Sequence, residues 1–237
     1  VNGFRIDDAA IAQGDAELML IELGLGQGGD GIAGVAFHVQ QALNDTAEAY
    51  GKYAAVHCHS KAGILLCAEV GIHTIEHASD IDDECIERIL SHGSHSAIIP
   101  TLGPIGLMRS GMLGESIAKK VRETSCEQQK MLEASRVGVL TGWGTDVSLD
   151  YYSSNPGSEF LLRKERGWTD VEMLEQATIN SARIIGMDDN LGTIKAGKIA
   201  NLVIVDGKPD EDIAVMTKYP WRILQAGKVT CAEGVIG

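Results

Sequence analysis

The sequence predicts an α/β protein in which a (β/α) barrel of parallel strands and helices is followed by a small β segment. Short apolar strands alternate with helices up to about residue 186, and this alternation is typical of a parallel sheet. After Gly186 the pattern changes to strands separated by turns. Of the 237 residues, 44% are hydrophobic and 22% are charged, which is enough apolar material for one core.

The first predicted elements surround a glycine-rich segment. Residues 17–23 are apolar and predict a short buried strand, and the run 24–34 predicts a mobile loop. A phosphate-binding loop is not expected there, because the spacing of a dinucleotide motif and the Lys-Ser/Thr pair of a P-loop are missing. A helix is expected over 39–50, where apolar residues recur on one face.

Strands and helices then alternate along the middle of the chain. The apolar runs predict strands at 53–57, 72–77, 97–101 and 138–146, and helices at 64–70, 82–90 and 115–136. Thr169 and Glu172 have the spacing of a capping box, which predicts the start of a helix over 171–177. A further helix over 181–185 is expected to end at Gly186.

The last part of the chain predicts β structure. Residues 191–206 read as strand, turn and strand, and 222–230 as a hairpin with Ala226 and Gly227 at its turn. We therefore expect two units: a barrel domain over 1–186 and a small β unit over 187–237.

Polar residues at the ends of successive strands favour a TIM-like barrel over an open sheet. His57, His77, Thr101 and Asp146 each close a predicted strand, and such barrels collect their active-site groups at these ends. An open sheet would place its chemistry at one switch point instead. About five strands before residue 186 are fewer than eight βα units need, so we expect a barrel that is incomplete at its N-terminal side. The open sheet edges of such a barrel lead us to expect a homo-oligomer.

Charge and cysteine content exclude several classes of protein. The 33 acidic and 20 basic residues give a net charge of −13, which disfavours binding to nucleic acid. No apolar run reaches the length of a membrane span, and no targeting signal opens the chain. Five cysteines without regular spacing do not predict a disulfide framework, so we expect a cytoplasmic protein.

Five motifs occur in an order that resembles a known superfamily. They are Val56-His57-Cys58-His59, Thr74-Ile75-Glu76-His77, Gly144-Thr145-Asp146, the stretch 177–183 and the stretch 192–206. Together they resemble the metal-dependent amidohydrolases, and within them the imidazolonepropionase-like branch that includes Xaa-Pro dipeptidases. The resemblance covers roughly 17–229. It implies a distorted barrel, a β-sandwich segment that includes 187–237, and one or two divalent metal ions at the barrel mouth.

The resemblance also implies roles for single residues. His57 matches the metal histidine of the fifth barrel strand, His77 that of the sixth, and Asp146 the eighth-strand aspartate that binds metal and shuttles a proton. His59 is expected either to face the substrate or to hold a metal-binding residue in place by contacting it from outside the metal's own shell of ligands. Imidazole and carboxylate ligands suit Zn²⁺ or Mn²⁺, and zinc is the expected cofactor.

The sequence departs from the family pattern at two places. The family takes a His-x-His pair from its first strand, and no histidine occurs before Phe37. His57 and His59 could be that pair, but His77 follows too soon for this assignment. In dipeptidases of the family a lysine on the fourth barrel strand bridges two metal ions. The first lysine of this chain is Lys52, so the strand expected over 17–23 has no such lysine. Glu22 is the oxygen ligand expected there, which favours one metal ion or a glutamate-bridged pair.

The expected function is hydrolysis of the amide C–N bond of a dipeptide-like or small cyclic amide substrate. Metal-bound hydroxide would attack the carbonyl group, and Asp146 would deliver the proton to the leaving nitrogen. Deamination is disfavoured, because no glutamate stands three residues after His57. Tyr151, Tyr152 and Arg163 could bind a substrate carboxylate or serve surface packing. The alternative is a non-catalytic remnant that needs additional chain for a full site.

Overall fold

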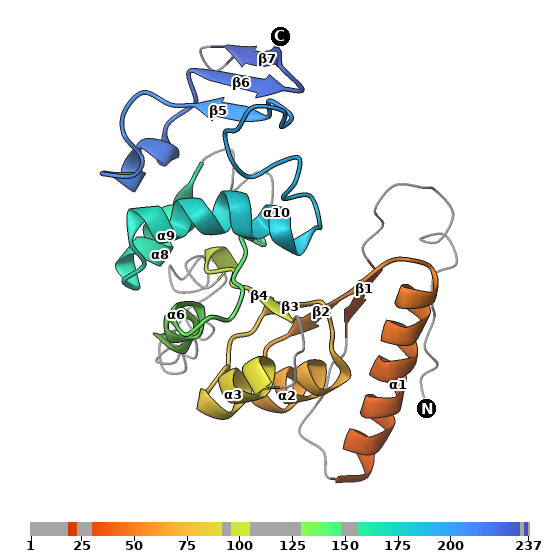
Figure 1. Cartoon of the computed structure of the whole chain (residues 1–237). Helices are drawn as coiled ribbons and strands as arrows, with labels where there is room; N and C mark the ends of the chain where they lie inside the picture. The colour runs from red at the N-terminus through yellow and green to blue at the C-terminus, as the bar shows by residue number, and fades with distance from the viewer. Residues whose placement is uncertain are drawn as a thin grey trace.

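The computed structural model describes residues 19–22, 30–91, 96–104, 129–147, 156–232 and 235–236 (Figure 1). Tyr151 and Tyr152, considered above as carboxylate-binding residues, lie outside these ranges. The same holds for residues 24–29 of the expected loop and for the expected helix before residue 129. The α/β fold class is confirmed by a parallel sheet whose strands alternate with helices.

The parallel sheet places its strands in chain order. It consists of β1 (Met19–Glu22), β2 (Ala54–Cys58), β3 (Thr74–His77) and β4 (Ala97–Ile99), each paired with the next. A further parallel bridge joins Ile98 to Thr141, so the chain adds a fifth neighbour beside β4. This order is that of a barrel wall, in which each strand pairs with its successor in the chain.

Three helices pack on this sheet. They are α1 (Asp30–Ala49), α2 (Lys61–Val70) and α3 (Asp83–Ser91), and α2 and α3 lie side by side on one face (Figure 1). The core between helices and strands contains Ile64, Ile72, Ile75 and Ile98, none of which is exposed.

Local signals set the ends of α2 and α9 (Asp170–Glu175), although α2 begins at Lys61, three residues before the expected start at 64. Ser60 accepts a hydrogen bond from the backbone N–H of Gly63 at the start of α2, and Gly71 ends this helix in a left-handed conformation. At the start of α9 both hydrogen bonds of the capping box are formed. The Glu172 backbone N–H donates to the Thr169 hydroxyl, and the Thr169 backbone N–H donates to the Glu172 carboxylate. The C-terminal end of α2 and the capping box of α9 depend only on neighbouring residues, which explains why the sequence predicts these two.

Three local expectations are wrong. The strand expected over 138–146 is reduced to an isolated bridge at Thr141. The run 24–34 is not a loop throughout, because α1 already begins at Asp30 and includes Gly31 and Gly34. A glycine costs a helix only about 1 kcal/mol, which the rest of a 20-residue helix can offset. Residues 191–201 also form turns rather than a strand. Gly192 adopts a φ of 82° and its Cα packs so tightly that a side chain would lie 2.8 Å from Ala182 Cβ.

The second half of the chain supplies helices and a separate antiparallel sheet. The helices are α6 (Gln129–Arg136), α8 (Ser158–Glu165), α9, the π-helical turn η3 (Gln176–Asn180), α10 (Ser181–Ile184) and the 3₁₀ helix η4 (Ile213–Thr217). The sheet contains β5 (Leu202–Ile204), β6 (Arg222–Gln225), β7 (Lys228–Ala232) and β8 (Val235–Ile236) in this order. It lies beyond α8, α9 and α10 as seen from the parallel sheet (Figure 1).

The expected hairpin is confirmed. Strands β6 and β7 pair through a turn at Ala226 and Gly227, whose φ angles are 48° and 78°. Two successive positive φ angles are typical of the tightest hairpin turn.

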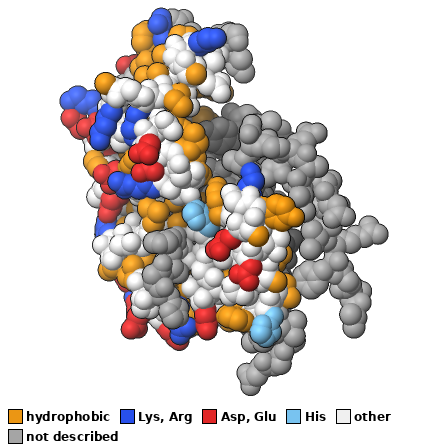
Figure 2. All heavy atoms as spheres, turned by 45° about the vertical axis from the view of Figure 1, so that its right-hand side comes forward, with side chains coloured by type: hydrophobic (Ala, Val, Ile, Leu, Met, Phe, Trp, Pro, Cys, Tyr) orange, Lys and Arg blue, Asp and Glu red, His pale blue; other side chains and the backbone are white. Residues whose placement is uncertain are grey.

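The surface carries mixed charge. On the face shown in Figure 2, acidic and basic side chains are interspersed. Exposed ion pairs such as Lys130–Glu133 contribute little to stability in water. Among the helices within the described ranges, none combines the length and the apolar character that crossing a bilayer requires.

Candidate metal centre

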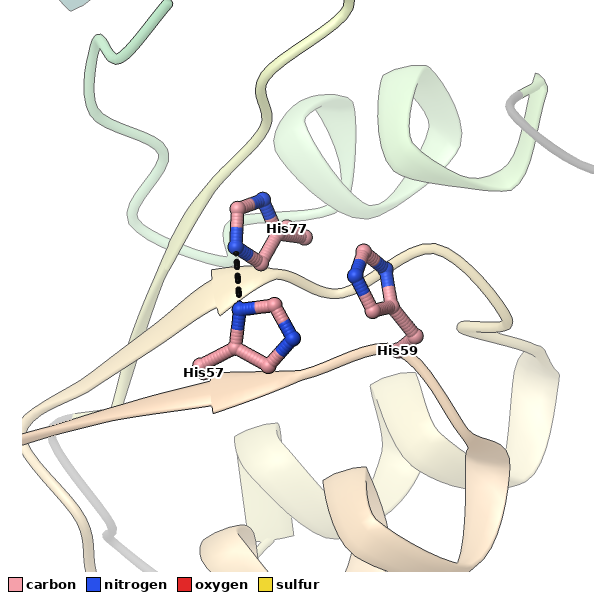
Figure 3. A group of neighbouring side chains, drawn as sticks. All are labelled: His57, His59 and His77. Atoms are coloured by element: carbon pink, nitrogen blue, oxygen red, sulfur yellow. Dashed lines mark hydrogen bonds between the residues drawn. The ribbon is translucent and has the colours of Figure 1, made fainter. Parts of the chain in front are cut away.

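Three imidazole rings converge at the carboxyl ends of β2 and β3. His57 lies in β2, His59 directly follows it, and His77 is the last residue of β3 (Figure 3). One ring nitrogen from each of the three lies within 4.8 Å of the others. The convergence follows from topology, since the ends of neighbouring parallel strands meet, and residues i and i+2 of an extended segment share one face.

The backbone at the end of β3 turns sharply. His77 and Ala78 both adopt left-handed conformations, with φ angles of 72° and 49°. The Ala78 N–H donates to the Cys58 carbonyl at 3.0 Å, and the Asp80 N–H to the His59 carbonyl at 2.8 Å. Non-glycine residues in this region store about 1–3 kcal/mol of strain each, and such strain concentrates at functional sites.

Hydrogen bonds hold the orientation of two rings. His77 Nδ1 lies 2.6 Å from Thr101 Oγ1, and His59 Nδ1 lies 2.8 Å from Ser79 Oγ. The other nitrogen of His77, Nε2, lies 2.8 Å from His57 Nδ1 (Figure 3). A partner on one ring nitrogen fixes the tautomer and leaves the other nitrogen for a ligand, as in metal sites of proteins.

The electrostatic environment keeps two of these imidazoles neutral. The pKa of His77 is lowered to about 4, mainly because the ring is buried and also because His59 and His57 are nearby, whereas the Asp146 carboxylate opposes the change. Loss of solvent around part of the ring also lowers the pKa of His59, with His57 adding to the effect. Neutral imidazole is the form that binds a metal ion, so the site is ready to do so at neutral pH.

The donor set fits a zinc ion. Zinc binds imidazole nitrogens at about 2.0–2.1 Å in a tetrahedral arrangement, which places two such nitrogens about 3.4 Å apart. Separations between 2.8 and 4.8 Å bracket this value, so small side-chain movements bring all three nitrogens to one ion. The three histidines thus form a group that could hold a divalent metal ion.

The other expected ligands lie at neighbouring strand ends. Asp146 is exposed, has a φ of 49°, and is close enough for its charge to raise the pKa of His59 and His77. It is not a member of the three-histidine group. Glu22 ends β1, and its Cα pairs with that of His57. The roles of Asp146 and Glu22 as ligands, and that of Asp146 or His59 in catalysis, stay predictions.

Arg163 has neither of the two roles expected from the sequence. The side chain neither lies at the surface nor reaches the histidines as a substrate clamp, because it is completely buried. It donates hydrogen bonds to Glu159 on its own helix and to Pro100 and Gly142 backbone carbonyls. The spacing of Glu159 and Arg163, four residues apart beside apolar Phe160, is the one local signal that could have indicated an inward-facing pair.

Comparison with known proteins assigns the family. The model of the "Amidohydrolase family" matches residues 33–224. The chain belongs to this amidohydrolase family. The fold is accordingly of the TIM-barrel type, and the sequence-based assignment to the imidazolonepropionase and Xaa-Pro dipeptidase branch is confirmed.

Curated relatives and solved structures are similar over most of the chain. Ochratoxinase from Aspergillus niger is 27% identical over 191 residues, covering 76% of this chain and 38% of the relative. Imidazolonepropionase from Streptococcus gordonii is 28% identical over 188 residues, covering 75% and 53%. A prolidase crystallised with N-methylphosphonate-L-proline is 29% identical with a TM-score of 0.72, covering 81% and 48%. The chain thus spans about half the length, or less, of these relatives.

Proposed function

We propose that this amidohydrolase is a zinc-dependent enzyme that cleaves the amide C–N bond of a dipeptide-like or small cyclic amide substrate. The observation that carries the proposal is the convergence of His57, His59 and His77 at the strand ends, with the Asp146 charge nearby. The names of the relatives supply the substrate class. A prolidase crystallised with N-methylphosphonate-L-proline and an imidazolonepropionase are both similar to this chain.

Each residue has a defined task in this proposal. His57, His59 and His77 would hold the zinc ion, with Glu22 as a further oxygen ligand from β1. When bound, zinc lowers the pKa of a water molecule and polarises a carbonyl group. Asp146 would accept the proton of the attacking water and pass it to the leaving nitrogen, for which an exposed carboxylate at the mouth is suited.

A metal-binding experiment tests the proposal. The affinity of the full chain for Zn²⁺ would be measured by competition with a chromophoric chelator, for the unaltered protein and for His57→Ala, His59→Ala and His77→Ala. We expect each substitution to weaken binding by at least about 100-fold, because one of three nitrogen ligands is lost. His38→Ala is the matched control, since this histidine is exposed on α1 and outside the group.

Hydrolysis completes the test. The zinc-loaded protein is expected to release free amino acids from Xaa-Pro dipeptides or N-acyl amino acids, and Asp146→Asn is expected to keep zinc but lose this activity. An unaltered protein that binds no zinc and hydrolyses none of these substrates would support the alternative, a non-catalytic remnant. We favour the hydrolase because the family match and the three imidazoles both support it.

We propose that residues 1–186 form the barrel domain and 187–237 the β-sandwich segment, that the protein is a homo-oligomer, and that it is cytoplasmic. Four cysteines in the described part, Cys58, Cys67, Cys85 and Cys231, are free thiols, which agrees with a reducing compartment. The mass from light scattering on a size-exclusion column tests the oligomer.

A further inference from the structure

Two charged residues of α8, Glu159 and Arg163, form a buried ion pair. Glu159 and Arg163 stand four residues apart on α8, with 1% and 0% of their side chains exposed, and Arg163 Nε donates to Glu159 Oε1 at 2.9 Å. Burial raises the pKa of Glu159 and lowers the pKa of Arg163, so loss of solvent outweighs their mutual attraction. A pair of this kind contributes little net stability compared with apolar residues of similar volume. Stability alone therefore does not explain it.

The pair holds the segment that follows β4. The Glu159 carboxylate accepts hydrogen bonds from the backbone N–H groups of Leu102 at 2.9 Å and Gly103 at 3.0 Å. Arg163 Nη2 donates to the Pro100 carbonyl at 2.6 Å. The residue between these anchors is Thr101, whose hydroxyl contacts His77 Nδ1.

The same pair holds the segment that leads to Asp146. Arg163 Nη1 donates to the Gly142 carbonyl at 3.1 Å, and the guanidinium group lies 4.2 Å from the centre of the Trp143 ring. The two held segments also touch, since a Cβ atom on Gly103 would lie 2.6 Å from the Thr145 carbonyl oxygen. Gln176 accepts a bond from Arg163 at 2.6 Å and so fixes the guanidinium plane.

We infer that Glu159 and Arg163 are positioning residues of the metal centre, because they fix the two strand-end segments that carry Thr101 and Asp146. Through Thr101 they set the orientation of the His77 ring. The inference rests on the proposed function, but the hydrogen bonds that it explains are formed by this chain's own residues.

The test compares substitutions that break the pair with a readout at His77. Arg163→Lys keeps the charge but loses the planar fork that reaches two carbonyls, and Glu159→Gln replaces one acceptor by a donor facing the N–H groups. The readouts are the ¹⁵N chemical shifts of the His77 ring in metal-free protein and the dissociation constant for Zn²⁺. We expect the His77 signals to shift and zinc binding to weaken by about 10- to 100-fold, the range found when outer partners of metal ligands are changed.

A second ion pair of the same residue types supplies the matched control. Arg136 and Glu172 join α6 to α9 at the protein surface, with Arg136 Nε 2.8 Å from Glu172 Oε1, and neither contacts the centre. Arg136→Lys and Glu172→Gln are expected to leave both readouts unchanged.

A double substitution separates positioning from folding. Glu159→Leu combined with Arg163→Met removes both charges together and so avoids leaving a single buried charge without its partner, and we expect its His77 signals to stay displaced. Wild-type signals and zinc affinity in a folded Arg163→Lys or double variant would overturn the inference. Failure of all these variants to fold would assign the pair to the fold alone and overturn it equally. If the unaltered protein binds no zinc, the proposed function fails, while the His77 signals still decide the inference.

Discussion

The hydroxyl group of Thr101 offers the sharpest test of how the metal centre is built. The residue is 8% exposed, and Thr101→Val removes the hydroxyl group while keeping nearly the same shape. His77 Nδ1 then loses its partner at 2.6 Å in a buried place. Thr141→Val is the matched control, because Thr141 is also buried and its hydroxyl donates only to the Val139 carbonyl at 3.0 Å.

The two substitutions should differ in zinc binding far more than in stability. Each leaves a buried polar group without a partner, which costs about 1–3 kcal/mol of the free energy of unfolding. Only Thr101→Val frees the His77 ring to rotate. We expect it to weaken zinc binding by about 10- to 100-fold, or about 1.4–2.7 kcal/mol. We expect less than about a 2-fold change for Thr141→Val, since no imidazole contacts that hydroxyl.

The assay combines two measurements at one pH. Urea unfolding of the metal-free proteins gives the free energy of unfolding, and competition with a chromophoric chelator gives the zinc dissociation constant. Equal losses of zinc affinity in both variants would show that general loosening of the fold, not the orientation of His77, weakens the site. Wild-type affinity in Thr101→Val would refute the reasoning outright.

Two further predictions concern stability. In metal-free protein the pKa of His77 is about 4, below its ordinary 6.5, so the unfolded chain takes up this proton first as the pH falls. The free energy of unfolding from urea titrations should therefore be level above pH 6.5 and fall by about 1–2 kcal/mol between pH 6.5 and 4, after allowance for solvent at the mouth; a level profile throughout would contradict this. Gly157→Ala should lower the free energy of unfolding by about 2–4 kcal/mol, because φ is 69° and the new Cβ would overlap the Met216 carbonyl group. Gly51→Ala, at a φ of 66° with nothing within 4 Å, should cost only about 1 kcal/mol, and equal costs in a denaturation series would refute the steric argument.

The sequence predicts those parts of the site that depend on strand ends. His57 and His77 close neighbouring apolar strands, and in a parallel sheet this position alone brings them together. The hairpin at Ala226 and the capping box at Thr169 are likewise predictable, because each depends on residues within a few positions of one another.

Features set by distant contacts could not be predicted in this way. The sequence favours a clamp or a surface position for Arg163, because charged side chains are seldom buried. Its carbonyl partners at Pro100 and Gly142 lie 63 and 21 positions away in the chain, and no periodic pattern reports them. The turns over 191–201 have the same origin, since Lys198 binds the carbonyls of Asp188 and Leu191 and folds the segment on itself.

The left-handed backbone at His77 and Asp146 has a consequence for how the protein can change over time. Glycine adopts these angles without strain, so exchanging the exposed Asp146 for glycine should relieve strain, whereas the same exchange at His77 would also remove a buried ring and leave the Thr101 hydroxyl without its partner. A laboratory selection that rewards thermal endurance alone would be expected to drift toward glycine at position 146 but not at position 77. Selection for the hydrolysis proposed above would keep the Asp146 side chain together with its backbone strain.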